Sequence, residues 1–232
     1  MSFQLFPSNQ HALWKLIEER ASVDSDKAAV DQRIWESFGV EGAIVFTDLA
    51  GFTRRTEELG ITHFLETVYY SQRLLRPIID EHKGIVVEIV GDSMLLWFDD
   101  LNDSLNCSVA MQRACREFNA DRMPSEQVLL CLGIGYGRTL KIDNVRLAGP
   151  QVNVASKLGE DTAEGYEILV SNAVKEQAAP NADLEFVLTG ISFPGSLGLP
   201  GTIGRASSRP VTPWPEHSSH GVTRLLYLCG AS

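Results

Sequence analysis

Two aspartates, Asp48 and Asp92, are the residues of this 232-residue chain best placed to bind a metal ion. Asp48 follows the apolar run 44–46, which is typical of a short buried strand, and a turn containing Gly51 comes next. Gly51 has no Cβ, so backbone N–H groups can approach a ligand there, and the N-terminus of the following helix adds partial positive charge. A carboxylate beside such a turn suits a phosphate, because a divalent cation bridges two groups that otherwise repel each other.

Asp92 belongs to a predicted β-hairpin. Residues 85–90 and 93–98 are two short apolar runs, and the only residues between them are Gly91 and Asp92. Before this hairpin, apolar residues recur at helical spacing over about residues 54–82, which predicts one long helix with a buried face. This order of elements places the end of the first strand beside the hairpin tip. We therefore expect Asp48 and Asp92 to meet, although more than forty residues separate them in sequence.

The remaining pattern predicts an α+β fold. The order is βαββαβ, which is the ferredoxin-like split βαβ sheet with helices on one face, followed by additional C-terminal α/β elements. The later elements are predicted as a helix at about 103–119, strands at 128–136 and 143–147, a helix at 151–159, a strand at 167–171, a helix at 171–178 and strands at 184–189 and 223–229.

Three regions follow from this pattern. Residues 1–42 are predicted to be an N-terminal helical extension, residues 43–190 the central domain, and residues 191–232 a long loop with a closing strand. The loop itself, about residues 190–221, is rich in Gly, Pro and Ser and has no periodicity, so it is either functional or mobile. The two helices of the extension are predicted from apolar stripes, namely Leu13, Trp14 and Ile17 after a Ser8 cap, and Ile34, Trp35 and Phe38.

Composition excludes several classes of protein. A formal charge of −10 and a pI near 5.0 argue against nucleic acid as a partner, because such a partner needs a basic face. The four cysteines form no CxxC pair and are expected to be reduced, as in a cytosolic protein. No apolar run approaches the roughly 18 residues that span a bilayer, and no signal peptide is recognisable, so we expect no membrane partner and a cytoplasmic location.

Three segments, in this order and spacing, resemble the catalytic domain of class III nucleotidyl cyclases. They are FTDLAGFT (46–53), EIVGD (88–92) and GPQVNVASKL (149–158), and the resemblance covers about residues 42–190. It implies conversion of a nucleoside triphosphate to a 3′,5′-cyclic nucleotide and pyrophosphate. It also implies two divalent metal ions, Mn²⁺ or Mg²⁺, as cofactors. A diguanylate cyclase, which shares a similar sheet, has no support because the chain contains no Gly-Gly-Asp/Glu-Glu-Phe hairpin.

The resemblance also implies roles for individual residues. Asp48 and Asp92 hold the two metal ions, and the Leu49 carbonyl completes one site. The ions lower the pKa of the ribose 3′-hydroxyl and neutralise the triphosphate, so that the hydroxyl attacks the α-phosphorus in line. Backbone N–H groups that bind the β- and γ-phosphates are implied at Ala50, Gly51, Phe52 and Thr53.

Asn153 and Lys157 are four residues apart and therefore share one face of their predicted helix. By resemblance, Asn153 orients the ribose and position 157 stabilises charge on the α-phosphate, both in the site of the opposite chain. This implies a homodimer with two shared active sites. Lys157 stands where the family usually has Arg and lacks the planar fork, so a catalytically inactive nucleotide-binding dimer is an alternative.

Two further positions concern the base. Adenylyl cyclases pair Lys with Asp, and guanylyl cyclases usually Glu with Cys, at positions that here hold Glu88 and Arg146. Glu accepts from a ring N–H and Arg donates to a carbonyl, which matches guanine or uracil better than adenine. The bulk of Arg146 favours a pyrimidine, so UTP is preferred over GTP, CTP or ATP as the expected substrate. A salt bridge between Glu88 and Arg146 is the structural alternative.

A cyclase without a recognisable sensor domain also resembles the pyrimidine cyclases of bacterial Pycsar anti-phage systems, whose product acts on a separate effector protein. That resemblance implies cyclic UMP as the product. The sequence does not decide which basic residues contact the triphosphate. Arg54 and Arg55 either reach the phosphates or stay solvated, and Arg205 or Arg209 could cover the β- and γ-phosphates from the long loop.

Overall fold

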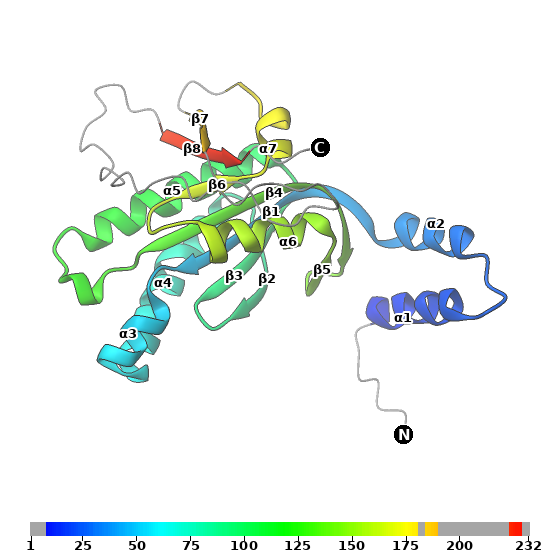
Figure 1. Ribbon diagram of the computed structural model, residues 1–232, viewed down its shortest axis with the longest axis horizontal. Helices are drawn as coiled ribbons and strands as arrows, with labels where there is room; N and C mark the ends of the chain where they lie inside the picture. The colour runs from blue at the N-terminus through cyan, green and yellow to red at the C-terminus, as the bar shows by residue number, and fades with distance from the viewer. Residues whose placement is uncertain (1–7, 181–183, 190–222, 229–232) are drawn as a thin grey trace, which may run out of the picture.

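The computed structural model describes residues 8–180, 184–189 and 223–228 (Figure 1). The expected loop at 190–221, with Arg205 and Arg209, therefore lies outside the described residues, as does Cys229.

One mixed sheet organises the described residues. Its strand order is β2-β3-β1-β4-β6-β8-β7, and β5 pairs with β4 outside this path. Strand β1 lies at the centre, antiparallel to both β3 and β4, whereas β6 runs parallel to β4. The strands are β1 (Gly39–Leu49), β2 (Ile85–Val90), β3 (Ser93–Phe98), β4 (Leu130–Ile142), β5 (Arg146–Ala148), β6 (Ile168–Val170), β7 (Leu184–Thr189) and β8 (Thr223–Leu228).

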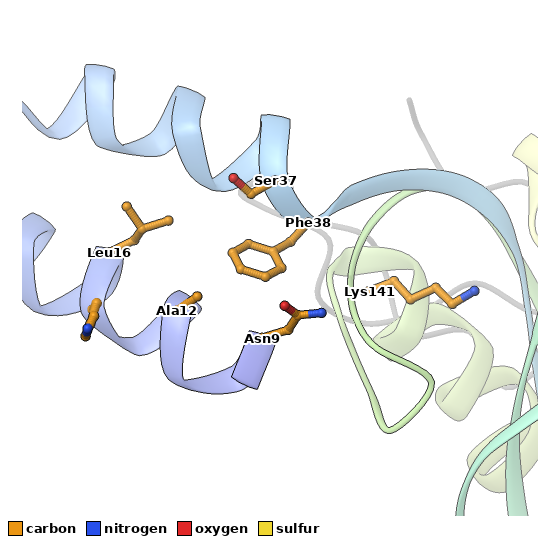
Figure 2. A pocket seen from close by; sticks show the side chains of 7 residues that line it. Asn9, Ala12, Leu16, Ser37, Phe38 and Lys141 are labelled. Atoms are coloured by element: carbon orange, nitrogen blue, oxygen red, sulfur yellow. The ribbon is translucent and has the colours of Figure 1, made fainter. Parts of the chain in front are cut away.

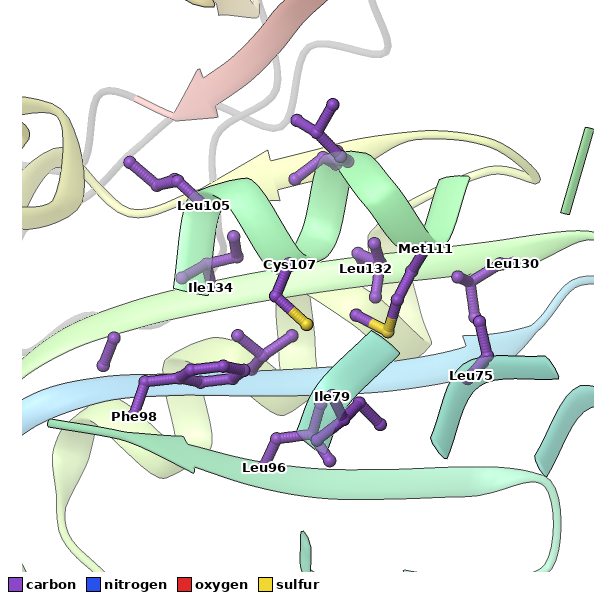
Figure 3. Close-up of a cluster of buried hydrophobic side chains, with 14 of the residues drawn as sticks. Leu75, Ile79, Leu96, Phe98, Leu105, Cys107, Met111, Leu130, Leu132 and Ile134 are labelled. Atoms are coloured by element: carbon purple, nitrogen blue, oxygen red, sulfur yellow. The ribbon is translucent and has the colours of Figure 1, made fainter. Parts of the chain in front are cut away.

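Helices α4 and α5 pack on one face of the sheet, and the main hydrophobic core lies between them and the strands (Figure 3). Helix α6 lies on the opposite face, over a smaller apolar cluster. The expected βαββαβ arrangement is confirmed, with α6 among the additional C-terminal elements. The helices are α1 (Ser8–Ala21), α2 (Lys27–Phe38), α3 (Phe52–Leu59), α4 (Ile61–Glu81), α5 (Leu101–Asn119), α6 (Pro150–Ser156) and α7 (Asn172–Gln177), with a 3-10 turn at Pro124–Glu126 and a π-helical segment at Lys157–Thr162.

The single long helix expected over residues 54–82 is wrong. The structure divides it into α3 and α4 at Gly60, whose φ of +88° and ψ of 159° lie far from helical values. Only glycine adopts such a conformation without steric penalty. Apolar spacing alone missed the break, because a helical periodicity can continue across one non-helical residue.

The two N-terminal helices are confirmed and form a hairpin that projects from one end of the sheet (Figure 1). Their apolar stripes pack on each other and on the last residues of β4, although Trp14 remains half exposed. A hollow of about 480 Å³ lies between the hairpin and β4 (Figure 2). It adjoins the Gly39 end of β1, nine residues and about 30 Å from Asp48 at 3.3 Å per residue.

Candidate active site

The structure brings Asp48 and Asp92 together as expected. Thr47 lies opposite Met94 where β1 pairs with β3, so the end of β1 reaches the turn of the β2–β3 hairpin. The Ser93 hydroxyl donates a hydrogen bond to Asp48 Oδ1 at 2.9 Å. Gly91, with φ of +61°, makes the tight turn that carries Asp92. The two carboxylates thus share one edge of the sheet.

The charges of these carboxylates are poorly compensated. Burial raises the pKa of Asp48 to about 6, and the neighbouring charge of Asp92 adds to the shift, while the hydrogen bond from Ser93 opposes it. Burial also raises the pKa of Asp92. One oxygen of Asp92, Oδ2, is buried and accepts no hydrogen bond within the described part of the chain. Two adjacent, half-buried carboxylates with an unused oxygen are a donor set that suits a divalent cation.

The same site offers a surface for an anion. Gly51 has φ of +79° and precedes α3, and no side chain caps the N-terminus of this helix. The first backbone N–H groups of α3 therefore lack partners inside the helix and can bind phosphate oxygens. They belong to Phe52 and the residues after it, whose side chains (52–54) lie outside the described part of the structure.

One predicted phosphate contact is wrong in this structure. The backbone N–H of Ala50 donates to the carbonyl oxygen of Leu129 at 2.8 Å, so it is already used. The reason is that the pairing between β1 and the segment leading into β4 continues one residue beyond Leu49. Gly51, Phe52 and Thr53 remain as candidate donors.

Asn153, on helix α6, and Lys157, the first residue of the π-helical segment after it, lie on one outer face. Both residues are exposed, and the Lys157 N–H donates to the carbonyl of Asn153, which places them one turn apart. Their side chains form no hydrogen bond or ion pair within residues that the structure describes. The opposite side of α6 contacts the sheet, so this chain's own β-strands do not use either residue.

Glycines in β4 explain how α6 reaches this position. A Cβ on Gly133 would lie 2.2 Å from the carbonyl oxygen of Ala155 and 2.3 Å from the amide of Gly159, and one on Gly135 would lie 2.6 Å from the carbonyl oxygen of Gln151. Since real Cβ atoms do not approach so closely, only glycine lets the helix backbone rest directly on the strand.

The base-reading candidates lie on strands β2 and β5, which contact each other but are not paired in the sheet. A β-bulge at Val87 leaves Val86 opposite Leu96 and Glu88 opposite Leu95. Without the bulge, Glu88 would point to the other face of the sheet, because side chains alternate along a strand. Leu95 packs in the cluster under α6, so Glu88 shares the α6 face.

Arg146 begins β5, which lies next to β2. Both Glu88 and Arg146 are exposed, and no ion pair joins them within the described residues. The structural salt bridge considered from sequence is therefore not formed in this chain.

Two residues near the metal-binding candidates were missed from sequence. Ser93 was read only as the first residue of a strand, although its place after Gly91 and Asp92 puts it opposite the end of β1. Glu160, three residues beyond Lys157, contributes negative charge that raises the pKa of Asp92. Its spacing of three residues from Lys157, which places the two on one side of a helix, was the signal in the sequence that could have identified it. In the described residues no group of three His, Cys, Asp or Glu side chains forms a metal site.

Comparison with known proteins gives the class. Residues 40–193, more than half of the chain, match the family described as "Adenylate and Guanylate cyclase catalytic domain". The protein therefore belongs to this family and contains a class III nucleotidyl cyclase catalytic domain, as the three sequence segments indicated. In the described part of the chain no helix is long and apolar enough to span a bilayer.

Two curated proteins are similar to part of this chain. The chain is 29% identical over 148 residues to an adenylate cyclase of Anabaena cylindrica, covering 56% of this chain and 29% of the relative. It is 28% identical over 144 residues to the serine/threonine-protein kinase pkn2 of Myxococcus xanthus, covering 52% and 17%. The chain thus spans less than a third of the length of these curated relatives.

Solved structures show the same fold. An adenylate/guanylate cyclase/hydrolase from Silicibacter pomeroyi superposes with a TM-score of 0.54 at 29% identity, over 60% of this chain and 79% of that one. The guanylyl cyclase Cya2 superposes with a TM-score of 0.53 at 24% identity, over 61% and 80%.

Proposed function

We propose that this protein is a metal-dependent nucleotidyl cyclase that converts a nucleoside triphosphate to a 3′,5′-cyclic nucleotide and pyrophosphate. One observation carries the proposal: two half-buried carboxylates, one with an unpartnered oxygen, lie beside an uncapped helix N-terminus. Cation-binding and phosphate-binding groups therefore lie next to each other, as phosphoryl transfer requires. Membership of the cyclase family supports the same reaction.

Asp48 and Asp92, with the Leu49 carbonyl, would hold two divalent ions, Mn²⁺ or Mg²⁺. Bound there, the ions supply positive charge that lowers the pKa of the ribose 3′-hydroxyl and offsets the charge of the triphosphate. The backbone N–H groups of Gly51, Phe52 and Thr53 bind the β- and γ-phosphates and fix the leaving pyrophosphate. Ser93 keeps Asp48 turned toward this space through its hydrogen bond.

Asn153 and Lys157 act in the site of a second copy of the chain. Their exposure on the side of this segment that points away from their own sheet supports the proposal. Asn153 orients the ribose, and the Lys157 ammonium stabilises charge that develops on the α-phosphate. Lys carries the same charge as the more usual Arg but forms no bidentate contact, so we expect a lower turnover number than with Arg at this position.

For the base we propose UTP, giving cyclic UMP. Glu88 lies on the α6 face and Arg146 on β5, which contacts β2, and no ion pair joins the two side chains. Together they offer an acceptor for uracil N3–H and a donor for a carbonyl beside it. Guanine presents similar groups, so a guanylate cyclase is the first alternative, and an adenylate cyclase the second. A pyrimidine product further suggests an anti-phage signal read by a separate effector protein.

Incubating the purified chain with Mn²⁺ and each of the four NTPs, followed by mass spectrometry of the products, tests this proposal. We expect cyclic UMP from UTP, and no cyclic product from the Asp48→Asn variant. Asp121→Asn, an exposed aspartate elsewhere, is the matched control and should retain activity. Nucleotide binding without any cyclic product would instead support an inactive dimeric module. We consider this alternative because position 157 is Lys, where the family usually has Arg.

A further inference from the structure

One arginine holds helix α3 against the connection between α5 and β4. Arg55 lies one turn beyond Gly51. Its Nη1 donates to the carbonyl oxygen of Gln127 at 2.7 Å, and its Nη2 donates to that of Pro124 at 3.1 Å. These carbonyls flank the short 3-10 turn 124–126, so a single planar guanidinium spans the whole turn. The sequence left open whether Arg55 reaches the phosphates or stays solvated. In the structure its guanidinium instead donates to backbone carbonyls of the protein itself.

Neighbouring bonds tie the same two segments together. The Ala50 N–H donates to the Leu129 carbonyl at 2.8 Å, and His63 Nε2 lies 2.8 Å from the Ser125 carbonyl oxygen. Residues immediately before and after α3 are thereby joined to one stretch, 125–129. Arg55 adds a contact from within α3 itself.

The described side chains of helix α3 contribute no buried apolar packing. It contains eight residues, it begins without a side-chain cap, and none of its described side chains (55–59) is buried. A helix this short is marginal unless tertiary contacts support it. Glycines with positive φ bound it on both sides, Gly51 at +79° and Gly60 at +88°. Among the described side chains of α3, polar contacts rather than buried apolar groups join the helix to its neighbours.

We propose that Arg55 is a positioning residue for polyphosphate binding: it sets the direction in which the first backbone N–H groups of α3 point. This rests on the proposed function, which makes a triphosphate the ligand of those groups. Only a fork with two separated N–H donors reaches both carbonyls, so Lys cannot fully replace Arg here. The turn 124–126 thereby becomes part of the phosphate site without touching the substrate.

Binding of Mg²⁺–tripolyphosphate to the full chain, measured by calorimetry, tests the proposal. For Arg55→Met we expect an affinity about tenfold weaker, which corresponds to about 1.4 kcal/mol, and for Arg55→Lys a partial loss of about threefold. Arg76→Met is the matched control, since Arg76 is an exposed arginine whose partner is Asp80 on the same helix, and its affinity should match that of the unmodified protein. Amide exchange over residues 52–59 should be faster in Arg55→Met than in the control.

The outcomes separate this inference from the proposed function. If Arg55→Met only lowers the melting temperature while tripolyphosphate binds as before, Arg55 is a structural residue and the proposal is wrong. Unchanged amide exchange over residues 52–59 rejects it as well. If the unmodified protein fails to bind Mg²⁺–tripolyphosphate, the proposed function is wrong. The role of Arg55 in polyphosphate binding is then wrong as well.

Discussion

At the scale of single residues, the site is defined by charge that the protein alone does not neutralise. Asp48 and Asp92 repel each other when both are ionised, and burial makes each charge more costly. Ser93 compensates only part of this with one hydrogen bond. Such an arrangement lowers the stability of the metal-free fold and becomes favourable when a cation binds. The same two charges that destabilise the free protein therefore increase its affinity for a cation.

Replacing Asp48 by Asn should stabilise the metal-free protein. In the folded chain the pKa of Asp48 is about 6, above the value of about 3.9 for an unfolded Asp. The folded state therefore binds the proton more tightly, and stability falls as pH rises from about 4 to 6. At pH 7, Asp48→Asn should raise the free energy of unfolding by about 1–2 kcal/mol, after allowance for partial exposure.

Urea unfolding in EDTA between pH 4.5 and 7.5 measures this difference. Asp48→Asn should also have a shallower decline with pH than the unmodified protein, whereas Asp121→Asn should follow the unmodified protein. A destabilised Asp48→Asn protein would mean that the carboxylate is well compensated in the fold. Added Mn²⁺ should stabilise the unmodified chain more at pH 7 than at pH 5, because protons compete with the metal below the pKa of Asp48.

We propose that single residues also decide the base preference. Glu88→Lys combined with Arg146→Asp places at these positions the pair expected for adenine, so activity should shift from UTP toward ATP. The effect arises because Lys donates to a ring nitrogen and Asp accepts from the exocyclic amine. Ratios of kcat/KM for the four NTPs, compared with the two single variants, measure the shift. An unchanged ratio of ATP to UTP would exclude these positions as base readers.

At the scale of elements, α6 has its position because β4 lacks side chains beneath it. Gly133→Ala should destabilise the protein by about 3 kcal/mol, since the added methyl meets backbone on two sides and the helix must lift. Gly135→Ala should have a smaller effect of the same sign, because its closest neighbour is more distant. Thermal unfolding measures both. A change within about 0.5 kcal/mol for Gly133→Ala would show that α6 moves freely on the sheet.

Local features of the fold could be predicted from the sequence, whereas features that involve distant segments could not. The strand–turn–helix at Asp48 and the two-residue hairpin at Asp92 were predictable, since turn residues and alternating apolar residues encode them directly. The break at Gly60 was not, because the apolar periodicity continues across that residue, and the bulge at Val87 was not, because it depends on how β2 pairs with β3. That bulge decides which face Glu88 occupies, so the orientation of a candidate site residue followed only from the structure.

Bonds between elements were likewise out of reach. Two sets of hydrogen bonds join segments about seventy or more residues apart. The Ala50 N–H donates to Leu129, and the Arg55 guanidinium donates to Pro124 and Gln127 at the turn 124–126. Backbone carbonyls carry no sequence signature, since every residue has one. Sequence could therefore propose which residues surround the phosphate, but not which of their donors were already engaged.

At the scale of the whole molecule, we propose that one chain holds two unlike halves of a site. The end of β1 and the hairpin tip supply carboxylates, whereas α6 and the π-helical segment after it present Asn153 and Lys157 away from the sheet. A twofold dimer in which each chain lends its α6 face to the other's carboxylates would complete two sites at once. The hollow beside the N-terminal hairpin adjoins the far end of β1 and plays no part in this arrangement.

Mixing two inactive variants tests that arrangement. Asp92→Ala removes the metal half of one chain and Asn153→Ala removes the α6 half of the other, so their heterodimer retains one intact site. With random pairing of equal amounts, about a quarter of the unmodified activity should return. Cyclic nucleotide formation after co-refolding or co-expression measures it. Asp48→Ala mixed with Asp92→Ala is the control and should stay inactive, because both changes damage the metal half. Equal activity in the two mixtures, or none in either, would mean that the sites are not shared between chains.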